Sequence, residues 1–215
     1  MTKSRIGILG GSFNPPHLGH LEMAEMAKNQ LNLRQVWLMI SPQNPLKSEQ
    51  DMAPLKHRFA MCEKLAAGKP WLKVTDIETR LGTRYTADTL EELKKEMPEI
   101  KFFWLMGDDN LASFHKWHNW QKIAELAPIV VFNRGGGKKA LESPVAKALK
   151  EHKVPPGSPE ETPPNWRILD NDLMPVSATE LREHKTEKSA FLTPDVAAYI
   201  KDKNLYNHFN ASTHK

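Results

Sequence analysis

Short apolar runs recur along this chain, and most are followed by a segment with the spacing of an amphipathic helix. The runs occupy residues 5–10, 36–40, 72–75, 102–106, 128–132 and 166–169. A strand that is apolar almost throughout, rather than at every second position, is typical of a sheet covered on both faces. The pattern therefore predicts an α/β fold: a doubly wound, Rossmann-like parallel sheet with helices on both faces.

The chain length of 215 residues suits a single domain of this kind, residues 1–215. Helices are expected at about 18–31, 54–67, 86–95 and 117–126, with a small C-terminal helical portion at about 178–206. The stretch 154–164 holds five of the 16 prolines, so we expect a mobile loop at about 153–165.

Charge and cysteine content narrow the class of partner. The net charge is +4, but the basic residues are scattered, which favours anionic small molecules over nucleic acid. The one cysteine, Cys62, follows apolar residues and is interpreted as a buried core residue. With no long apolar run either, we expect a cytoplasmic protein with no membrane partner; the sequence leaves room for a homo-oligomer.

The loop after the first strand carries the strongest chemical signal. Gly10 and Gly11 allow a tight turn and a close approach to a ligand. His17 and His20 fall in the first turn of the next helix, where free N–H groups and the helix dipole favour phosphate. The two side chains lie three residues apart, so both can face the same ligand. Gly19 is expected to leave room for the phosphates.

Rival interpretations of this loop fit less well. No nearby Cys, Asp or Glu completes a zinc site with the histidines. The spacing Gly-x-Gly-x-x-Gly of a dinucleotide site is absent, and no Gly-Lys-Ser/Thr of a Walker A loop follows. Packing or surface roles for the two histidines stay open.

Gly-Ser-Phe-Asn-Pro-Pro-His-Leu-Gly-His, ending at His20, resembles the nucleotidyltransferase superfamily that is marked by (His/Thr)-x-Gly-His. The stretch 176–182, Val-Ser-Ala-Thr-Glu-Leu-Arg, resembles that superfamily's second motif, Ile-Ser-Ser-Thr-x-x-Arg, with Ala178 replacing a serine. Ser177 and Thr179 can cap a helix and offer hydroxyls to phosphate, and Arg182 can pair with phosphate. Many superfamily members carry Asp at Asn14, so we assign Asn14 no acid–base role.

Nearly the whole chain resembles the bacterial nicotinate-nucleotide adenylyltransferases. The resemblance rests on Pro-Gln-Asn-Pro-Leu-Lys at 42–47 with Arg58 beyond it, Tyr-Thr-Ala-Asp-Thr-Leu at 85–90, Gly-Asp-Asp-Asn at 107–110, Trp117, and the ending at 194–206. Trp117 would provide a flat surface for the nicotinate ring. His118 stands at a position that is often aromatic in this family.

The resemblance implies an enzyme that transfers the adenylyl group of ATP to nicotinate mononucleotide, giving deamido-NAD and pyrophosphate. It implies the catalytic residues His17, His20, Lys47 and Arg182. Contacts to ATP are implied for Gly10, Gly11, Ser12, Phe13, His17, Gly19, His20, Gly107, Asp109, Ser177, Thr179 and Arg182. Contacts to nicotinate mononucleotide are implied for Asn44, Lys47, Thr86, Trp117, His118 and Arg134. Mg²⁺ is expected to arrive with ATP, since no carboxylate cluster suggests a protein cage.

Other functions remain alternatives. The acceptor could be nicotinamide mononucleotide, which differs by an amide, or phosphopantetheine, whose transferases lack the Tyr-Thr-x-x-Thr-Leu stretch. A class I aminoacyl-tRNA synthetase fragment would share His-x-Gly-His but should show a Lys-Met-Ser-Lys-Ser motif. A nucleotide-sensing protein without turnover is the non-enzyme alternative.

Overall fold

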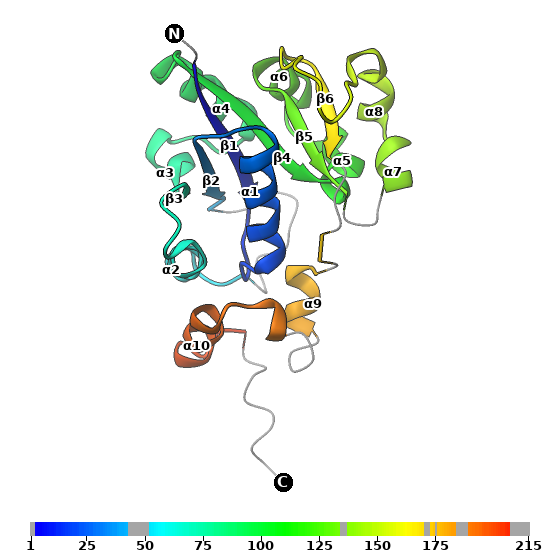
Figure 1. Ribbon diagram of the computed structural model, residues 1–215. Coiled ribbons are helices and arrows are strands. Elements are labelled where there is room, and N and C mark those ends of the chain that lie inside the picture. Colours follow the sequence, from blue (N-terminus) through cyan, green and yellow to red (C-terminus); the bar gives the residue numbers. More distant parts are fainter. Residues whose placement is uncertain are drawn as a thin grey trace.

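The computed structural model describes residues 3–42, 52–133, 137–169, 173–174, 176–183 and 189–206. Its centre is a six-stranded sheet in which all pairings are parallel (Figure 1). The strands are β1 (Ser4–Gly11), β2 (Gln35–Ile40), β3 (Leu72–Thr75), β4 (Ile100–Gly107), β5 (Ile129–Phe132) and β6 (Trp166–Leu169). Their order, β3-β2-β1-β4-β5-β6, reverses direction between β1 and β4. This is the doubly wound arrangement predicted from the sequence.

Burial explains why the strands carry so few polar residues. All five residues from Phe102 to Met106 in β4 are buried. Successive side chains of a strand point to opposite faces, so Phe103 and Leu105 belong to one core cluster and Trp104 to the other. The continuous apolar pattern therefore reflects a core on each side of the sheet.

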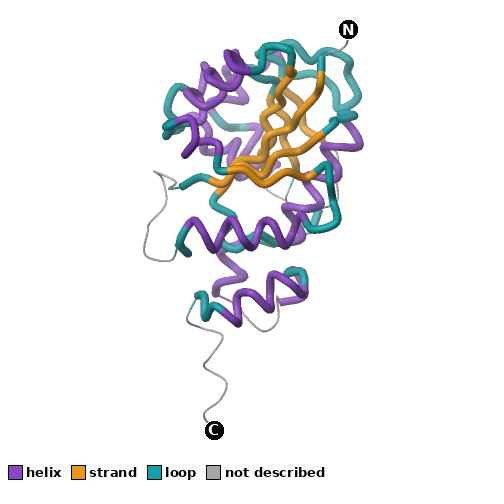
Figure 2. Tube along the Cα trace, turned by 90° about the vertical axis from the view of Figure 1, so that its left-hand side faces the viewer, coloured by secondary structure: helices purple, strands orange, loops and turns teal. Residues whose placement is uncertain are grey.

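Helices cover both faces of the sheet (Figure 2). On one face, α1 and α2 supply the buried residues of the first cluster; on the other, α4 and α6 supply those of the second. The helices are α1 (Leu18–Gln30), α2 (Leu55–Ala66), α3 (Ile77–Leu81), α4 (Thr86–Glu96), α5 (Asp108–Ser113), α6 (Trp120–Leu126), α7 (Gly137–Leu141), α8 (Pro144–Ala148), α9 (Ala178–Glu183) and α10 (Pro194–Asp202), with 3₁₀ turns η1 (Phe114–Lys116), η2 (Lys150–His152) and η3 (Ser189–Phe191). Cys62 is buried in α2, as expected.

The C-terminal helices α9 and α10 lie beyond the carboxyl ends of the strands (Figure 1). Helix α10 packs against α2, where Nδ1 of His57 and the hydroxyl of Tyr199 are 3.0 Å apart. Val196 and Ile200 of α10 are buried in the first core cluster. Helices α9 and α10 thus lie at the edge of the sheet at which α/β proteins bind ligands.

One predicted helix boundary is wrong. Residues 117–126 were expected to form one helix, but α6 begins at Trp120. Asn119 before it has φ of 49°, in the left-handed region, and Trp117 is extended. The chain therefore turns after η1, and Trp117 is left outside the helix. The short helices α3, α5, α7 and α8 were not predicted, because a segment of five or six residues carries little periodicity.

Two sets of side-chain contacts anchor the proline-rich segment. Both carboxylate oxygens of Glu161 contact Arg5 at 2.6 Å, and Lys101 lies 2.9 Å from the same carboxylate. Arg167 donates hydrogen bonds to the carbonyls of Pro156, Ser158 and Glu160. The mobility expected for 153–165 stays a prediction.

Across the described parts of the chain, no helix combines the length and apolar character needed to span a membrane.

Candidate active site

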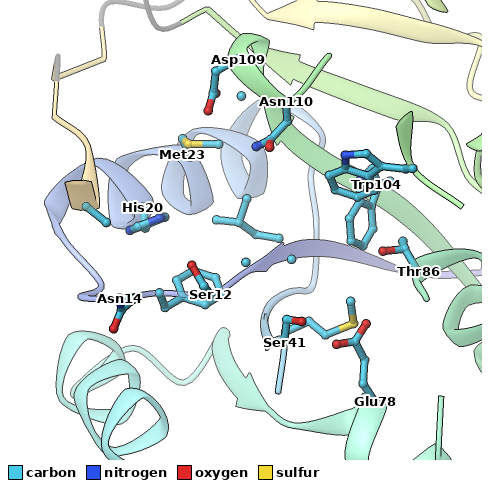
Figure 3. A pocket seen from close by; sticks show the side chains of 18 of the residues that line it. Ser12, Asn14, His20, Met23, Ser41, Glu78, Thr86, Trp104, Asp109 and Asn110 are labelled. Atoms are coloured by element: carbon cyan, nitrogen blue, oxygen red, sulfur yellow. The ribbon is translucent and has the colours of Figure 1, made fainter. Parts of the chain in front are cut away.

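A cavity of about 670 Å³ opens at the carboxyl ends of the central strands. It lies where the strand order reverses between β1 and β4, which is where ligands bind in sheets of this type. Figure 3 shows His20 and Asn14 at one end, Thr86 and Trp104 at the other, and Asp109 on the wall opposite Ser41. The cavity therefore joins the two regions that the sequence marked separately.

The end of β1 passes close to β4 in the floor of this cavity. A Cβ atom on Gly10 would lie 2.5 Å from Cη2 of Trp104, so a larger residue would displace the indole ring. Phe13 then takes φ of 46° and is buried. Glycine at position 10 leaves room for the indole ring of Trp104, which packs against the end of β1.

His17 and His20 stand together at the N-terminus of α1. Their ring centroids are 3.7 Å apart, and the backbone N–H of His17 donates to Nδ1 of His20 at 3.2 Å. A neutral His20 that accepts at Nδ1 carries its proton on Nε2, which makes Nε2 a hydrogen-bond donor. Both rings line the cavity, although His17 is only 1% exposed.

Gly19 differs from the other described residues that the sequence assigned to the site, because it does not line the cavity. A Cβ atom there would lie 2.9 Å from Cγ1 of Val176 and 3.1 Å from Nδ1 of His17. The absence of a side chain lets α1 pack against the segment that leads into α9. The space at Gly19 is therefore filled by protein rather than left for phosphate.

The second motif meets the first across the chain. Oγ of Ser177 accepts a hydrogen bond from the N–H of Glu180 and so caps α9, as predicted. Its hydroxyl proton remains available to donate to a ligand. Nη1 of Arg182 donates to the carbonyls of Asn14, at 2.6 Å, and Ala178, at 3.2 Å. Arg182 thus holds the first loop in place while it also lines the cavity.

Aromatic side chains form the opposite end of the cavity. Trp117 contacts Trp104 and Phe114 edge to face, with centroids 6.1 and 5.2 Å apart. His118 stacks on Tyr85 with centroids 4.2 Å apart. This stack joins the loop after η1 to the start of α4, where the N–H of a first-turn residue has no partner within the helix. Thr86, Trp117 and His118 consequently line one pocket.

The turn after β4 adds one acidic side chain to the cavity. Asp109 in α5 is exposed and lines it, whereas the neighbouring Asp108 is buried and lines a second cavity of about 510 Å³. Gly107 and Thr179 also lie in the lining. Three residues expected at the site, Asn44, Lys47 and Arg134, lie outside the described residues.

Comparison with known proteins agrees with this geometry. Residues 8–184 match the model of a family described as cytidylyltransferase-like. The chain belongs to this family. It is 41% identical to a relative from Agrobacterium fabrum, and the match covers 83% of this chain and 98% of the relative. A relative from Parvibaculum lavamentivorans is 45% identical, with 83% and 91% covered. Both are named "Probable nicotinate-nucleotide adenylyltransferase", so the family resemblance seen in the sequence is confirmed.

Solved structures support the fold of this family member. A nicotinic acid mononucleotide adenylyltransferase of Plasmodium falciparum, solved in complex with NaAD, superposes with a TM-score of 0.73 at 18% identity. The superposition covers 95% of this chain and 98% of the other. A putative nicotinate-nucleotide adenylyltransferase from Vibrio parahaemolyticus gives a TM-score of 0.60, also at 18% identity.

Two residues of this cytidylyltransferase-like chain support the site in ways that the sequence did not predict. Arg58 is 1% exposed and donates to the carbonyls of Ser12, Ser41, Pro42 and Ala53, each at 2.8 Å. Burial lowers the pKa of its guanidinium, and nearby ionisable groups oppose the change. Arg58 thus joins the ends of β1 and β2 to α2, a supporting role that the sequence did not predict.

Asn14 is the second supporting residue. Its Oδ1 accepts from the N–H of Ala53 at 2.9 Å and from the hydroxyl of Tyr206 at 2.8 Å. The loop after β1 is therefore fixed by α2 and by the C-terminal segment. Asparagine at this position thus acts as a hydrogen-bond acceptor that holds the loop.

Glu78, the second residue of α3, was also missed. It is 3% exposed and lines the cavity, and burial raises the pKa of its carboxyl to about 7, while a hydrogen bond with Ser41 opposes the rise. A signal was present, because Glu78 follows the predicted strand at 72–75 and so falls at its carboxyl end.

Proposed function

We propose that this chain is a nicotinate-nucleotide adenylyltransferase, which transfers the adenylyl group of ATP to nicotinate mononucleotide. The observation that carries the proposal is that one cavity joins the two histidines at the start of α1 to the aromatic pocket around Trp117. Relatives more than 40% identical over most of the chain bear this enzyme's name. The first end suits a triphosphate, and the second suits a flat ring.

The reaction is an in-line displacement at phosphorus. An oxygen of the mononucleotide phosphate forms a bond to the α-phosphorus of ATP, while the bond from that phosphorus to the bridging oxygen of the β-phosphate breaks. A phosphate monoester is largely ionised near pH 7, so the attacking oxygen needs no strong base. Catalysis then depends on positioning and on stabilising charge in the transition state.

The residues of the two motifs and Lys47 bind the phosphates in this scheme. His17 stabilises charge on the α-phosphate, and His20 and Ser177 bind the triphosphate. The N–H groups of Arg182 that face away from the Asn14 carbonyl bind the β- and γ-phosphates, which leave as pyrophosphate. Lys47 binds either the triphosphate or the incoming phosphate.

The remaining residues bind the adenosine of ATP and the nicotinate ring of the mononucleotide. Asp109 binds a ribose hydroxyl of the adenosine, and Gly10 to Phe13 with Gly107 line its path. Trp117 stacks on the nicotinate ring, backbone N–H groups near Thr86 and His118 bind its carboxylate, and Asn44 and Arg134 complete this site.

Mg²⁺ is proposed to enter on the phosphates of ATP. The described residues contain no group of three His, Cys, Asp or Glu side chains placed to hold an ion. Phosphate oxygens and water are the ligands that Mg²⁺ commonly keeps in such sites, and this donor set fits an open cavity. The ion would neutralise charge on the triphosphate.

We further propose a cytoplasmic location, since a single buried cysteine suits a reducing compartment.

A pyrophosphate-release assay with ATP and Mg²⁺ tests the proposal. Nicotinate mononucleotide, nicotinamide mononucleotide and phosphopantetheine are compared in parallel as acceptors. We expect the highest kcat/KM with nicotinate mononucleotide. A preference for either other acceptor would reassign the substrate, and nucleotide binding without any pyrophosphate release would indicate a sensor.

A further inference from the structure

Glu78 is a buried acid in the cavity wall to which the scheme above gives no role. Ser41 hydrogen-bonds to its carboxylate, yet Oε2 has no hydrogen-bond partner among the described residues. The side chain is 3% exposed, so bulk water does not readily replace that partner. A buried acceptor without a hydrogen-bond partner lowers the stability of the folded protein. In the absence of a ligand, Glu78 therefore destabilises the fold.

A bound ligand can supply the hydrogen-bond partner that Oε2 of Glu78 does not find among the described residues. Nε1 of Trp104, in the same cavity, is also buried and has no partner among the described residues. Oε2 of Glu78 accepts hydrogen bonds, and Nε1 of Trp104 donates them. This end of the cavity is therefore matched to a ligand that offers both a donor and an acceptor.

The position of Glu78 indicates which part of the ligand it meets. In Figure 3, Glu78 and Ser41 lie along the wall between Thr86, near the proposed ring pocket, and Ser12 in the phosphate loop. Helix α3, which carries Glu78, contacts both β2 and α4, and Thr86 at the start of α4 lines the same cavity. A mononucleotide with its ring at Trp117 and its phosphate near the histidines has its ribose between them.

The chemistry of nicotinate mononucleotide leaves few donors for Glu78. Near pH 7 the carboxylate and the phosphate are ionised, and the ring nitrogen is bonded to carbon and carries no hydrogen. The ribose hydroxyls are then the main hydrogen-bond donors of the molecule. We propose that Glu78 accepts a hydrogen bond from a ribose hydroxyl of the acceptor mononucleotide and thereby makes the enzyme selective for ribose. This inference rests on the proposed function.

The test combines a protein change with a ligand change. The wild type and Glu78→Gln are assayed with nicotinate mononucleotide and with its 2′-deoxy and 3′-deoxy forms. At pH 8, above its pKa of about 7, Glu78 is ionised, and hydrogen bonds to a charged group are among the stronger ones, so we expect Glu78→Gln to raise KM for the ribose substrate at this pH by roughly 10-fold or more. One deoxy form should show a similar loss with the wild type, and Glu78→Gln, which keeps an acceptor oxygen but loses the charge, should distinguish it from the ribose form much less.

The contrary outcomes separate this inference from the proposed function. Discrimination against the deoxy forms that persists unchanged in Glu78→Gln would overturn the inference alone, as would a rise in KM for ATP instead of the acceptor. A loss confined to nicotinamide mononucleotide would assign Glu78 to the ring amide and would also overturn it. Wild-type protein that releases no pyrophosphate with nicotinate mononucleotide would contradict both proposals. Glu161→Gln is the matched control: its carboxylate is largely buried but ion-paired outside the cavity, so its selectivity should equal that of the wild type.

Thermal unfolding of the ligand-free protein gives a second readout. Among the described residues, the charged or titratable side chains that line the same cavity as Glu78 are His17, His20, Arg84, Tyr85, Asp109, Lys116, His118 and Arg182. Because the carboxyl pKa is raised to about 7, the folded protein keeps this proton at pH values where the unfolded chain releases it. Stability is therefore lost as pH rises through 7. We expect Glu78→Gln to have a higher Tm than the wild type at pH 8 and little difference at pH 5. A lower Tm at pH 8 would show that Glu78 is structural and would overturn the inference.

Discussion

His17 combines burial with a place in the cavity wall, beside His20 and at the N-terminus of α1. Single donors that stabilise transition-state charge typically account for a factor of ~10²–10³ in turnover. We expect His17→Ala to reduce kcat by about this factor in the pyrophosphate assay, with an unchanged circular dichroism spectrum. His152→Ala, an exposed histidine in η2, should retain wild-type kcat. Near-normal turnover of His17→Ala would remove the histidine from the mechanism.

Trp117 has two roles to separate, because its edges pack in the core while it also lines the cavity. If its face binds the nicotinate ring, Trp117→Ala should raise KM for nicotinate mononucleotide by about 10-fold and leave KM for ATP nearly unchanged. Steady-state kinetics with each substrate varied in turn measures this. Trp120→Ala is the control, since Trp120 packs on Phe114 but does not line the cavity. Equal changes in both KM values would mean that Trp117 only supports the fold.

The sequence predicted the place in the site of some residues but not of others. The histidines and Ser177 were predicted because their motifs are local and their neighbours in sequence are also neighbours in space. Arg58 and Glu78 were not, because their burial depends on segments that lie far away in sequence. A charged residue is usually exposed, so its type alone gives no hint that it is enclosed.

At the level of elements, the cavity exists because the ends of β1 and β2 are held against the start of α2. Arg58 makes this connection through four carbonyls. Lysine presents its donors at one point and cannot reach all four acceptors, so some would be left buried and unpaired.

We therefore expect Arg58→Lys to lower the free energy of unfolding by about 3 kcal/mol and to raise KM for both substrates. Urea denaturation with the kinetic assay checks both effects. Arg80→Lys alters an exposed pair with Glu96 and should change stability by less than about 0.5 kcal/mol. An Arg58→Lys protein as stable as the Arg80 control would show that the four hydrogen bonds contribute little.

Element boundaries were predicted well where strands and helices are long. The strand at 72–75 and the helix at α1 agree with the structure to within a residue. The start of α6 was misplaced because Trp117 and Trp120 continue an apolar spacing that the left-handed residue Asn119 interrupts. Backbone conformation at one residue cannot be inferred from apolar spacing.

Across the whole molecule, Glu161 ties the proline-rich segment to the sheet through Arg5 of β1 and Lys101 of β4. Burial would raise the pKa of this carboxyl, but hydrogen bonds from Arg5 and Lys101 outweigh burial and lower it. The ion pairs therefore stabilise the fold above the ordinary carboxyl pKa, and this contribution disappears as pH falls through the lowered value.

Glu161→Gln should thus reduce the free energy of unfolding at pH 7 by about 2 kcal/mol, with a smaller difference from the wild type near pH 3. Limited proteolysis should cut within 153–165 faster, while kcat/KM stays the same because Glu161 does not line the cavity. Glu160→Gln, at an exposed neighbour, should leave both measurements unchanged. A destabilisation that persists undiminished at low pH would mean that the ion pairs are not its cause.

The C-terminal part of the chain belongs to the same unit as the sheet in our proposal of a single domain. Arg182 and Tyr206 both hydrogen-bond to Asn14, across 168 and 192 residues of sequence. Val196 and Ile200 are buried in the first core cluster. These contacts join the described parts of the segment after β6 to the first loop and to the core, and they support the proposal of a single domain.

The sequence by itself determined the parallel sheet, the two superfamily motifs and the family, because apolar periodicity and motif spacing are local properties of a chain. Tertiary structure alone decided that Gly19 packs against Val176, that Arg182 also braces the first loop, and that Glu78 is enclosed in the cavity wall. The burial and the hydrogen-bond partners of a side chain are set by residues far away in sequence, which only folding brings together.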